Sequence, residues 1–162
     1  MRIRNVKEGD YSDISPVINN WWGGRDMSDM VPKLFFVHFT ETSFIAEEDG
    51  KVVGFLIGFL SQTYPDEAYI HFAGVHPEYR RSKIGRKLYE QFFSVVLQQG
   101  RSVIRAVTSP VNKDSVNYHK RMGFELEKGD KELNGIPVHT HYDGIDQSRV
   151  LFMKYFQKEE TR

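Results

Sequence analysis

The fold is decided by residues 75–88, which read VHPEYRRSKIGRKL. An apolar run ends at Val75, and Pro77 stops it because proline has no N–H group to donate to a sheet. Apolar residues then recur at helical spacing from Ile84, and Gly100 marks the end of that pattern. The stretch therefore predicts a strand, a basic loop and a helix in succession.

Five cationic side chains crowd the start of the predicted helix, namely Arg80, Arg81, Lys83, Arg86 and Lys87. A helix N-terminus already carries about half a positive charge, so each cation there costs about 0.3–1 kcal/mol. Free amide groups, a small residue at Gly85 and flanking cations suit a phosphate group. The loop is therefore a candidate anion site, and charge alone does not distinguish it from a solvated basic patch. Neither the Walker pattern nor G-x-G-x-x-G is present, which excludes two common phosphate-binding loops.

Residues 76–88 resemble motif A of the GNAT superfamily, the acyl-CoA-dependent N-acetyltransferases, whose loop reads R/Q-x-x-G-x-G/A. Arg80 takes the first position of that pattern and Gly85 the last, while Lys83 stands where the first glycine is usual. A second block, NKDSVNYHKRMGF at residues 112–124, resembles the family's N-x-x-A/S-x-x-x-Y/H-x-x-x-G-F. The two blocks occur in the family's order, separated by one predicted helix and one predicted strand.

Predicted strands and helices alternate along the chain, which indicates an α/β domain with a mixed sheet. The resemblance implies a single GNAT-like domain over residues 1–162, with a mixed central sheet of about six to seven strands and about four helices. It further implies an enzyme that moves an acetyl group from acetyl-CoA, its co-substrate, directly to a primary amine of a small molecule or peptide. A non-catalytic acyl-CoA-binding or regulatory module is the alternative.

Cap and turn residues place the other elements. Ser15 is expected to cap a helix whose first residue is Pro16, after a looser turn at residues 11–14. The other expected helices cover about residues 29–39 and 112–122. The expected strands cover about residues 2–6, 43–47, 51–61, 68–75 and 102–108. Residues 124–156 are expected to form two more strands joined by a long connection, and residues 149–155 are the second of these. Residues 157–162 are expected to fray.

The resemblance assigns coenzyme A contacts to the basic loop and its surroundings. The edge of the strand at Gly74 and Val75 would pair with the pantetheine arm, and an amide there could face the thioester oxygen. Backbone amides of the loop would hold the pyrophosphate. The full set of expected coenzyme contacts is Gly74, Val75, Arg80, Arg81, Ser82, Lys83, Ile84, Gly85, Arg86, Asn112 and Ser115.

Acetyl transfer needs a neutral amine, and an aliphatic amine with a pKa near about 10.4 is mostly protonated at neutral pH. His71 is the best candidate base, because it lies on the strand four residues before Val75, where many family members carry a glutamate. The alternative is a strand histidine whose hydrogen bonds are already satisfied. Asp66 and Glu67 could act in its place through a water molecule.

The leaving thiolate usually meets a tyrosine in this family, and here His119 occupies that position, with Tyr118 one residue before it. A histidine can donate a proton to a thiolate, so both residues are candidate catalytic groups. The alternative for His119 is a histidine that only contacts the coenzyme.

In the family, two connecting segments shape the acceptor pocket, which assigns candidate substrate contacts to Trp21, Trp22, His139, His141 and Tyr142. The two tryptophans could equally be core anchors beside Gly23 and Gly24. Two histidines in a long loop of a chain without cysteine do not predict a metal site.

The composition limits which other classes of protein the chain could belong to. The 162 residues are 40% hydrophobic and 27% charged, which is ordinary for one globular domain. Lys and Arg total 22, as do Asp and Glu, so no global field favours a nucleic acid or an anionic membrane as partner. The absence of cysteine excludes disulfides and a thiol nucleophile. Without a signal-peptide core or a long apolar run, the protein is expected to be cytoplasmic. The sequence leaves open whether it forms a homodimer.

Overall fold

The computed structural model describes residues 1–157, and the chain falls into two compact units. The first unit comprises residues 1–60 and 70–100, and the second comprises residues 61–69 and 101–162. Within the described residues, seven strands form the main sheet, two form a separate hairpin, and there are five α-helices. The predicted mixed α/β fold is confirmed. The single domain stays a prediction, and the expected fraying of 158–162 lies outside the described residues.

In the first unit the strands lie in the order β1 (Arg2–Asn5), β2 (Phe44–Glu48), β3 (Lys51–Leu60) and β4 (Glu67–Val75), of which β4 begins in the second unit. β1 pairs with β2 and β2 with β3, both antiparallel. Asp49 and Gly50 have φ angles of 51° and 78°, which confirms the predicted hairpin turn. Six consecutive residues of β3 are buried, so both of its faces are covered, as its apolar run predicts.

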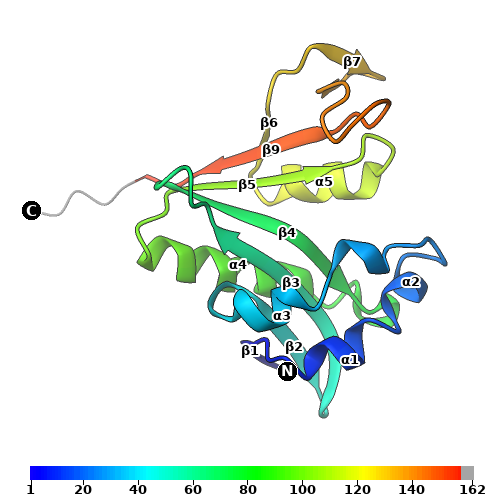
Figure 1. The fold of residues 1–162 in the computed structure, drawn as a ribbon, viewed down its shortest axis with the longest axis vertical. Helices are drawn as coiled ribbons and strands as arrows, with labels where there is room; N and C mark the ends of the chain where they lie inside the picture. The colour runs from blue at the N-terminus through cyan, green and yellow to red at the C-terminus, as the bar shows by residue number, and fades with distance from the viewer. Residues whose placement is uncertain (158–162) are drawn as a thin grey trace, which may run out of the picture. The chain divides into compact units, whose positions relative to one another are not determined.

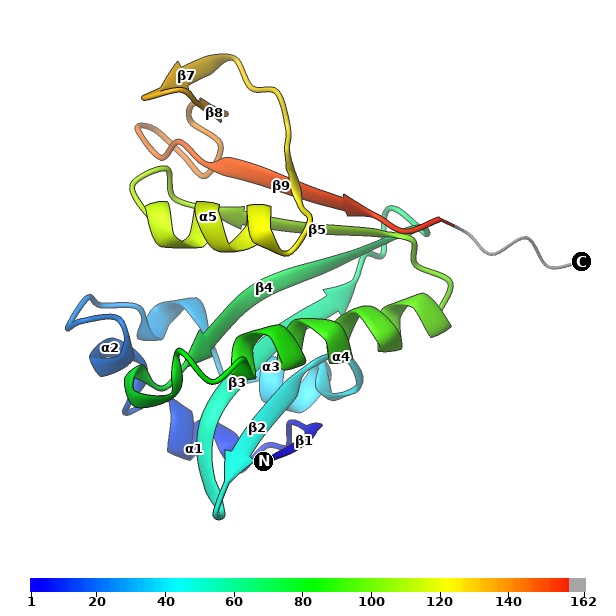
Figure 2. The same cartoon turned by 180° about the vertical axis from the view of Figure 1, so that it is seen from behind.

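Two layers of helix cover the strands of the first unit (Figures 1 and 2). α3 (Leu34–His38) lies in front of β2 and β3 in Figure 1, and α4 (Ile84–Gln98) lies in front of them in the opposite view of Figure 2. The core on the α3 side is a cluster of buried apolar residues: Val6, Ile14, Ile18, Trp21, Val31, Phe36, Ile45, Phe55 and Ile57. On the other side, α4 buries a stripe that begins at Ile84 and Leu88.

The predicted helix capped by Ser15 is wrong. The chain forms α1 (Asp10–Ile14) and then α2 (Ile18–Trp21), and Ser15 ends the first helix by donating its N–H to the carbonyl of Tyr11 at 2.9 Å. Pro16 has no N–H to continue α1, so the helix breaks there rather than starting there.

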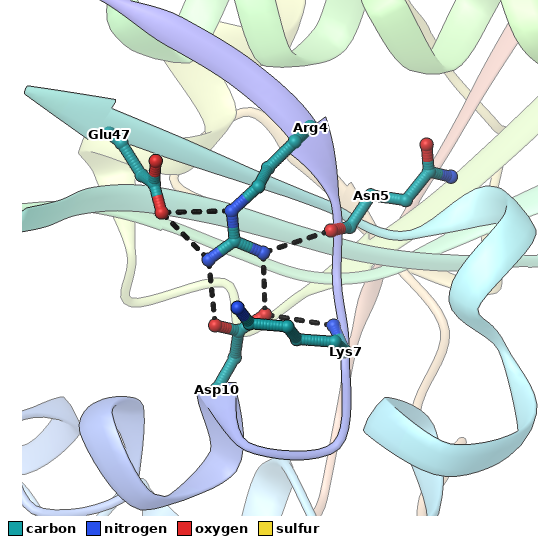
Figure 3. A network of polar contacts seen from close by, with 5 residues as sticks. All are labelled: Arg4, Asn5, Lys7, Asp10 and Glu47. Carbon is teal, nitrogen blue, oxygen red and sulfur yellow. Dashed lines mark hydrogen bonds and ion pairs between the residues drawn. The ribbon is translucent and has the colours of Figure 1, made fainter. Parts of the chain in front are cut away.

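A partly buried ion-pair network explains why α1 begins early (Figure 3). Arg4 binds the carboxylate of Asp10 through two nitrogens, each at 2.8 Å, and also binds Glu47 at 2.8 Å. The same carboxylate accepts the backbone N–H of Lys7 at 2.8 Å, which turns the chain into the helix. Burial by itself would raise the pKa of Asp10, but the bonds from Arg4 and Lys7 outweigh it and hold that pKa below its ordinary value.

The predicted helix over residues 29–39 is also wrong in extent. A 3₁₀ turn at Ser28–Met30 is followed by a break, and α3 begins only at Leu34. Val31 has φ −130° and ψ 70°, which is outside the helical region. The residue before a proline disfavours the helical conformation, and Pro32 follows Val31 directly.

In the second unit, β5 (Val103–Thr108), β9 (Val150–Tyr155) and β6 (Glu125–Leu126) lie side by side in that order, with antiparallel pairing. α5 (Lys113–Arg121) connects β5 to β6. Arg105 on β5 binds Glu67 at 2.7 Å and also binds Glu127.

The connection between the last two predicted strands contains an additional hairpin. β7 (Lys131–Leu133) and β8 (Ile136–Val138) pair with each other across Asn134 and Gly135, whose φ angles are 52° and 80°. The predicted Asn-Gly turn is confirmed, and the strands on either side are too short to show an alternating pattern. No helix among residues 1–157 is long and apolar enough to cross a membrane.

Candidate functional site

The basic loop leads from β4 into α4 through a 3₁₀ turn at Pro77–Tyr79. The side chain of His76 accepts the N–H of Glu78 at 3.1 Å, which fixes the start of this turn. Lys83, the residue just before α4, has φ 65° and ψ 15°, the left-handed conformation that glycine adopts most easily. A loop of this shape therefore favours a glycine at position 83, although this chain has a lysine there.

The first turn of α4 presents backbone amides without a side-chain cap. Lys83 makes no capping hydrogen bond, and no acidic residue occupies the first turn. The cationic side chains of Arg81, Lys83, Arg86 and Lys87 are all exposed around it. An uncapped helix start surrounded by cations provides N–H donors and positive potential for an anionic group.

Arg80 differs from its cationic neighbours because its guanidinium is held by the protein backbone. One nitrogen donates to the carbonyl of Trp21 at the end of α2, and Nε donates to the carbonyl of Val75 at 3.3 Å. Arg80 thus joins the loop to α2 and to β4. Its expected role as a coenzyme contact stays a prediction.

Gly74 is required by a packing contact. A Cβ atom at this position would lie 2.3 Å from Cη2 of Trp22 and 3.1 Å from Cε1 of Phe55. The Trp22 ring also packs on Phe72, with ring centroids 4.7 Å apart. Trp21, by contrast, is 3% exposed and belongs to the core cluster. The two tryptophans therefore differ, because Trp21 is a core residue and Trp22 covers the end of β4.

Gly54 on β3 was not among the residues expected from the sequence. A Cβ there would lie 3.0 Å from Cγ2 of Ile84 and 3.1 Å from Cδ1 of Leu88. The absence of a side chain thus lets the first turn of α4 pack directly on β3, which sets the height of the basic loop above the sheet. An isolated glycine inside a strand pattern is a signal of such close approach.

His71 lies on β4 between aromatic rings and a backbone carbonyl. Its Nε2 is 2.5 Å from the carbonyl oxygen of Met30, and its ring stacks on Phe35 with centroids 4.6 Å apart and planes 13° apart. Of the two alternative bases, the Glu67 carboxylate accepts from Nε of Arg105 at 2.7 Å. The backbone carbonyl of Asp66 accepts the amides of Ser102 and Val103. Glu67 is thus engaged in an ion pair, whereas the described hydrogen-bond partner of the His71 ring is the backbone carbonyl of Met30.

In the second unit, α5 is organised as the second sequence block predicts. Asn112 caps the helix by accepting the N–H of Ser115 at 3.1 Å. Gly123 has φ 88°, and the N–H of Phe124 donates to the carbonyl of His119 at 2.9 Å. These bonds form a Schellman ending, so the G-F pair has the predicted structural role. The hydroxyl of Tyr118 is buried on this helix.

His119 is a buried, neutral residue. It is 6% exposed and stacks on Phe152, with ring centroids 4.3 Å apart and planes 11° apart. Burial lowers the pKa of His119 to about 4, although the bond to the carbonyl of Ser115 acts in the opposite direction. That carbonyl can only accept, so Nδ1 of His119 donates to it at 2.7 Å. At neutral pH the single imidazole proton is therefore on Nδ1 and is already shared with Ser115.

His139, His141 and Tyr142 lie in the connection between β8 and β9. His139 forms a β-bridge with Arg149, and its Nε2 is buried without a hydrogen-bond partner among residues 1–157. Nδ1 of His141 accepts the N–H of Asp146 at 3.0 Å. Burial raises the pKa of Tyr69, and Tyr142 and Asp143 act in the same direction, so these side chains lie near one another. The assignment of this segment to the acceptor stays a prediction.

Comparison with known proteins agrees with this arrangement. The model of the acetyltransferase (GNAT) family matches residues 10–124, which is more than half of the chain. The chain belongs to the GNAT family. The match includes residues 80–85, where Lys83 adopts the left-handed conformation, and the role of these residues as coenzyme contacts stays a prediction.

Individual relatives are distant. The L-2,4-diaminobutyric acid acetyltransferase of Nocardia farcinica is 31% identical over 94 residues, covering 56% of this chain and 49% of that protein. The chain thus spans about half the length of this curated relative. Ard1 from Thermoplasma volcanium has a TM-score of 0.74 at 18% identity, covering 97% and 98% of the two chains. The structure of yncA from Salmonella typhimurium with its cofactor acetyl-CoA has a TM-score of 0.70 at 17% identity, covering 100% and 97%. These structural likenesses show that the chain has the GNAT fold.

Proposed function

We propose that the protein is an enzyme that transfers the acetyl group of acetyl-CoA to a primary amine. The observation that carries this proposal is the uncapped, acid-free start of α4 behind a left-handed Lys83, on the motif with which GNAT proteins hold their coenzyme. A merely solvated basic patch would not need the strained backbone at Lys83. The proposal also agrees with the bound acetyl-CoA in the yncA structure.

The residues of the loop fit the phosphates of a coenzyme A molecule. Amides at the start of α4, from Ile84 to Arg86, would donate to the pyrophosphate, and the exposed cations Arg81 and Lys83 would balance its charge. Bound there, acetyl-CoA supplies the activated acetyl group. Arg80 serves a different purpose in this proposal, because its bonds to two carbonyls hold the loop in shape.

His71 is the proposed general base. The amine arrives mostly as an ammonium ion, and unmasking it at pH 7.4 costs about 4 kcal/mol. The carboxylate of Glu67, the alternative base, is already engaged in an ion pair with Arg105 at 2.7 Å. The aromatic rings of Trp22, Phe35 and Phe72 around this part of β4 would attract an ammonium ion through their π faces.

Tyr118 is the proposed proton donor for the leaving thiolate. A donor role for His119 at neutral pH conflicts with a pKa of about 4 and with the Nδ1 proton that Ser115 already accepts. A tyrosine hydroxyl carries its proton at neutral pH and needs no prior protonation. In this proposal His119 packs α5 against Phe152 and so holds the position of the preceding tyrosine.

The acceptor is proposed to be a small-molecule amine. The relative from Nocardia farcinica acts on L-2,4-diaminobutyric acid, a compact diamino acid, and supports this class over a large polycation. A peptide amine is the second candidate, and the cytoplasm is the compartment in which we expect the protein to act.

Turnover decides between enzyme and binding module. Purified protein with acetyl-CoA and a panel of amines, including 2,4-diaminobutyrate, lysine, polyamines and short peptides, should release thiol in step with N-acetylated product measured by mass spectrometry. Stabilisation by acetyl-CoA without turnover on small amines or peptides would instead favour the non-catalytic module.

A further inference from the structure

We propose that His71 accepts the proton of the amine at Nδ1, and that Met30 and Phe35 are what make Nδ1 the basic atom. Met30 would do so by holding the proton on Nε2, and Phe35 by fixing the plane of the ring. Phe35 is then a positioning residue for the acetyl transfer. This inference rests on the proposed function, because it assigns the working atom of the proposed base.

The hydrogen bond to Met30 determines the tautomer. Nε2 of His71 is 2.5 Å from the carbonyl oxygen of Met30, and a carbonyl can only accept a hydrogen bond. The proton of the neutral imidazole must therefore be on Nε2, which leaves a lone pair on Nδ1. The bond to Met30 thus assigns the two ring nitrogens different roles, with Nε2 as donor and Nδ1 as acceptor.

Stacking determines the direction in which Nδ1 points. The His71 ring lies on Phe35 with centroids 4.6 Å apart and planes 13° apart, and Phe72 lies at 6.4 Å with a tilt of 43°. Phe35 is itself packed on Phe39 at 5.2 Å. A ring held by a hydrogen bond at one end and by stacking on one face has little freedom to rotate. The lone pair of Nδ1 is thus preorganised rather than averaged over rotamers.

The described contacts of the His71 ring are uncharged. They are the Met30 carbonyl, Phe35 and Phe72, and none of these titrates. The elements that supply those contacts carry Asp29 in the 3₁₀ turn at Ser28–Met30, and Lys33 and His38 at the two ends of α3. Lys33 is paired with Glu8 at 3.4 Å. A pH profile assigned to His71 must therefore be distinguished from the effects of these three side chains.

The proton balance of the proposed reaction closes without another reactant. Nδ1 takes one proton from the ammonium ion, and the Nε2–H bond to Met30 then stabilises the imidazolium. The free amine nitrogen forms a bond to the acetyl carbonyl carbon, and the C–S bond breaks with its electron pair on sulfur. Tyr118 gives its proton to the thiolate and is restored by the second proton that the nitrogen loses, so the products are an N-acetyl amine and a thiol. His71 finally returns its proton to water.

Nuclear magnetic resonance tests the tautomer without any substrate. Protein labelled with ¹⁵N-histidine should show a His71 ring with a protonated Nε2 and an unprotonated Nδ1 at a pH where the ring is neutral, with His71→Gln providing the assignment. A protonated Nδ1, or an even mixture of tautomers, would overturn the proposal even if the enzyme is active.

Kinetics test the positioning role with matched variants. Phe35→Leu should lower kcat by about tenfold with the KM for acetyl-CoA unchanged and should mix the His71 tautomers, whereas Phe35→Tyr should retain both properties. Val37→Ala is the control, because Val37 lies on the same helix with an exposed side chain. His71→Gln should cost about 10²–10⁴ in kcat/KM and remove the acidic limb of its pH profile.

The possible outcomes distinguish failure of the inference about the His71 tautomer and Phe35 from failure of the proposed function. A Phe35→Leu variant that loses only thermal stability, with the tautomer and kcat preserved, refutes the positioning role. A His71→Gln variant that retains both rate and pH limb refutes the base. If wild-type protein acetylates no amine, the proposed function fails, while the tautomer is still decided by the spectrum.

Discussion

The imidazole of His119 lies flat on the ring of Phe152, with centroids 4.3 Å apart and planes 11° apart. The residue on α5 that the family pattern marks as a candidate proton donor is therefore packed as an aromatic core residue. Its polar edge is used inside its own helix, because Nδ1 donates to Ser115. This relationship has a consequence for stability that can be measured without any substrate.

Acid should destabilise the protein through His119. His119 binds a proton near pH 6.5 in the unfolded chain but only near pH 4 in the folded protein. Between these pH values the unfolded state therefore binds more protons than the folded state. The unfolding free energy consequently falls as the pH is lowered through this range. At about 1.4 kcal/mol per tenfold change in the acid constant, the loss between pH 7.5 and 4 is about 3 kcal/mol. His119→Phe keeps a ring on Phe152 but cannot titrate. Urea unfolding at the two pH values should show a smaller loss in this variant, and an equal loss in both proteins would contradict the assignment.

Acetyl-CoA should stabilise the fold through the start of α4. At a hundredfold excess over Kd the expected gain is about 2.7 kcal/mol, seen as a rise in Tm. Gly85→Glu puts bulk and negative charge among the first-turn amides and should abolish the rise. Gln98→Glu adds the same charge at the other end of α4, where it is exposed, and should leave the rise intact. An unchanged rise in Gly85→Glu would place the coenzyme elsewhere.

Three substitutions at Lys83 separate charge from backbone conformation. Its φ of 65° suits glycine, costs other residues about 1 kcal/mol, and is least compatible with a β-branched side chain. Lys83→Gly, Lys83→Gln and Lys83→Val remove the same charge. We expect affinity for coenzyme A, measured by calorimetry, to be retained best in the glycine variant and lost most in the valine variant. Equal affinities in all three would show that only the charge matters.

A double-mutant cycle should show coupling between Gly74 and Trp22. Gly74→Ala places a Cβ 2.3 Å from the Trp22 ring, which should lower the unfolding free energy by about 1–3 kcal/mol. In a Trp22→Leu background the same substitution should cost at least about 1 kcal/mol less, because the ring that it collides with is gone. If the losses of unfolding free energy from Gly74→Ala and Trp22→Leu simply add, the Cβ at position 74 does not collide with the Trp22 ring.

Local signals predicted the part of the chain that carries the coenzyme motif. The ends of β4, α4 and α5 are marked by Pro77, Gly100, Asn112 and Gly123, and each acts on residues within a turn of itself. Such signals do not depend on partners that are distant in the chain, so the ends of these elements can be predicted from the sequence alone.

The predicted helix over residues 29–39 is wrong for a local reason, Pro32 after Val31, whereas other features depend on partners that are distant in sequence. α1 begins at Asp10 because of Arg4 and Glu47, and the second of these is 37 positions away from Asp10 along the chain. The burial of His119 depends on Phe152, and the glycine at 74 is explained by Trp22. A periodic pattern identifies which residues share a helix face, but it does not say which ring will cover that face. The sequence therefore marks His119 as a candidate proton donor, but it does not contain the contact with Phe152 that buries the ring.

Arg80 donates to the carbonyls of Trp21 and Val75 and so ties three backbone segments together. Segments joined through one shared side chain open cooperatively, as a single local unfolding unit. Amide hydrogen exchange should therefore report one opening free energy for residues 18–24 and 77–83, although more than fifty positions separate them. Arg80→Ala should split that unit in two, with the end of α2 exchanging faster and independently of the loop. The first arginine of the motif would then act as a cooperativity element, linking the order of the coenzyme loop to that of the tryptophan pair.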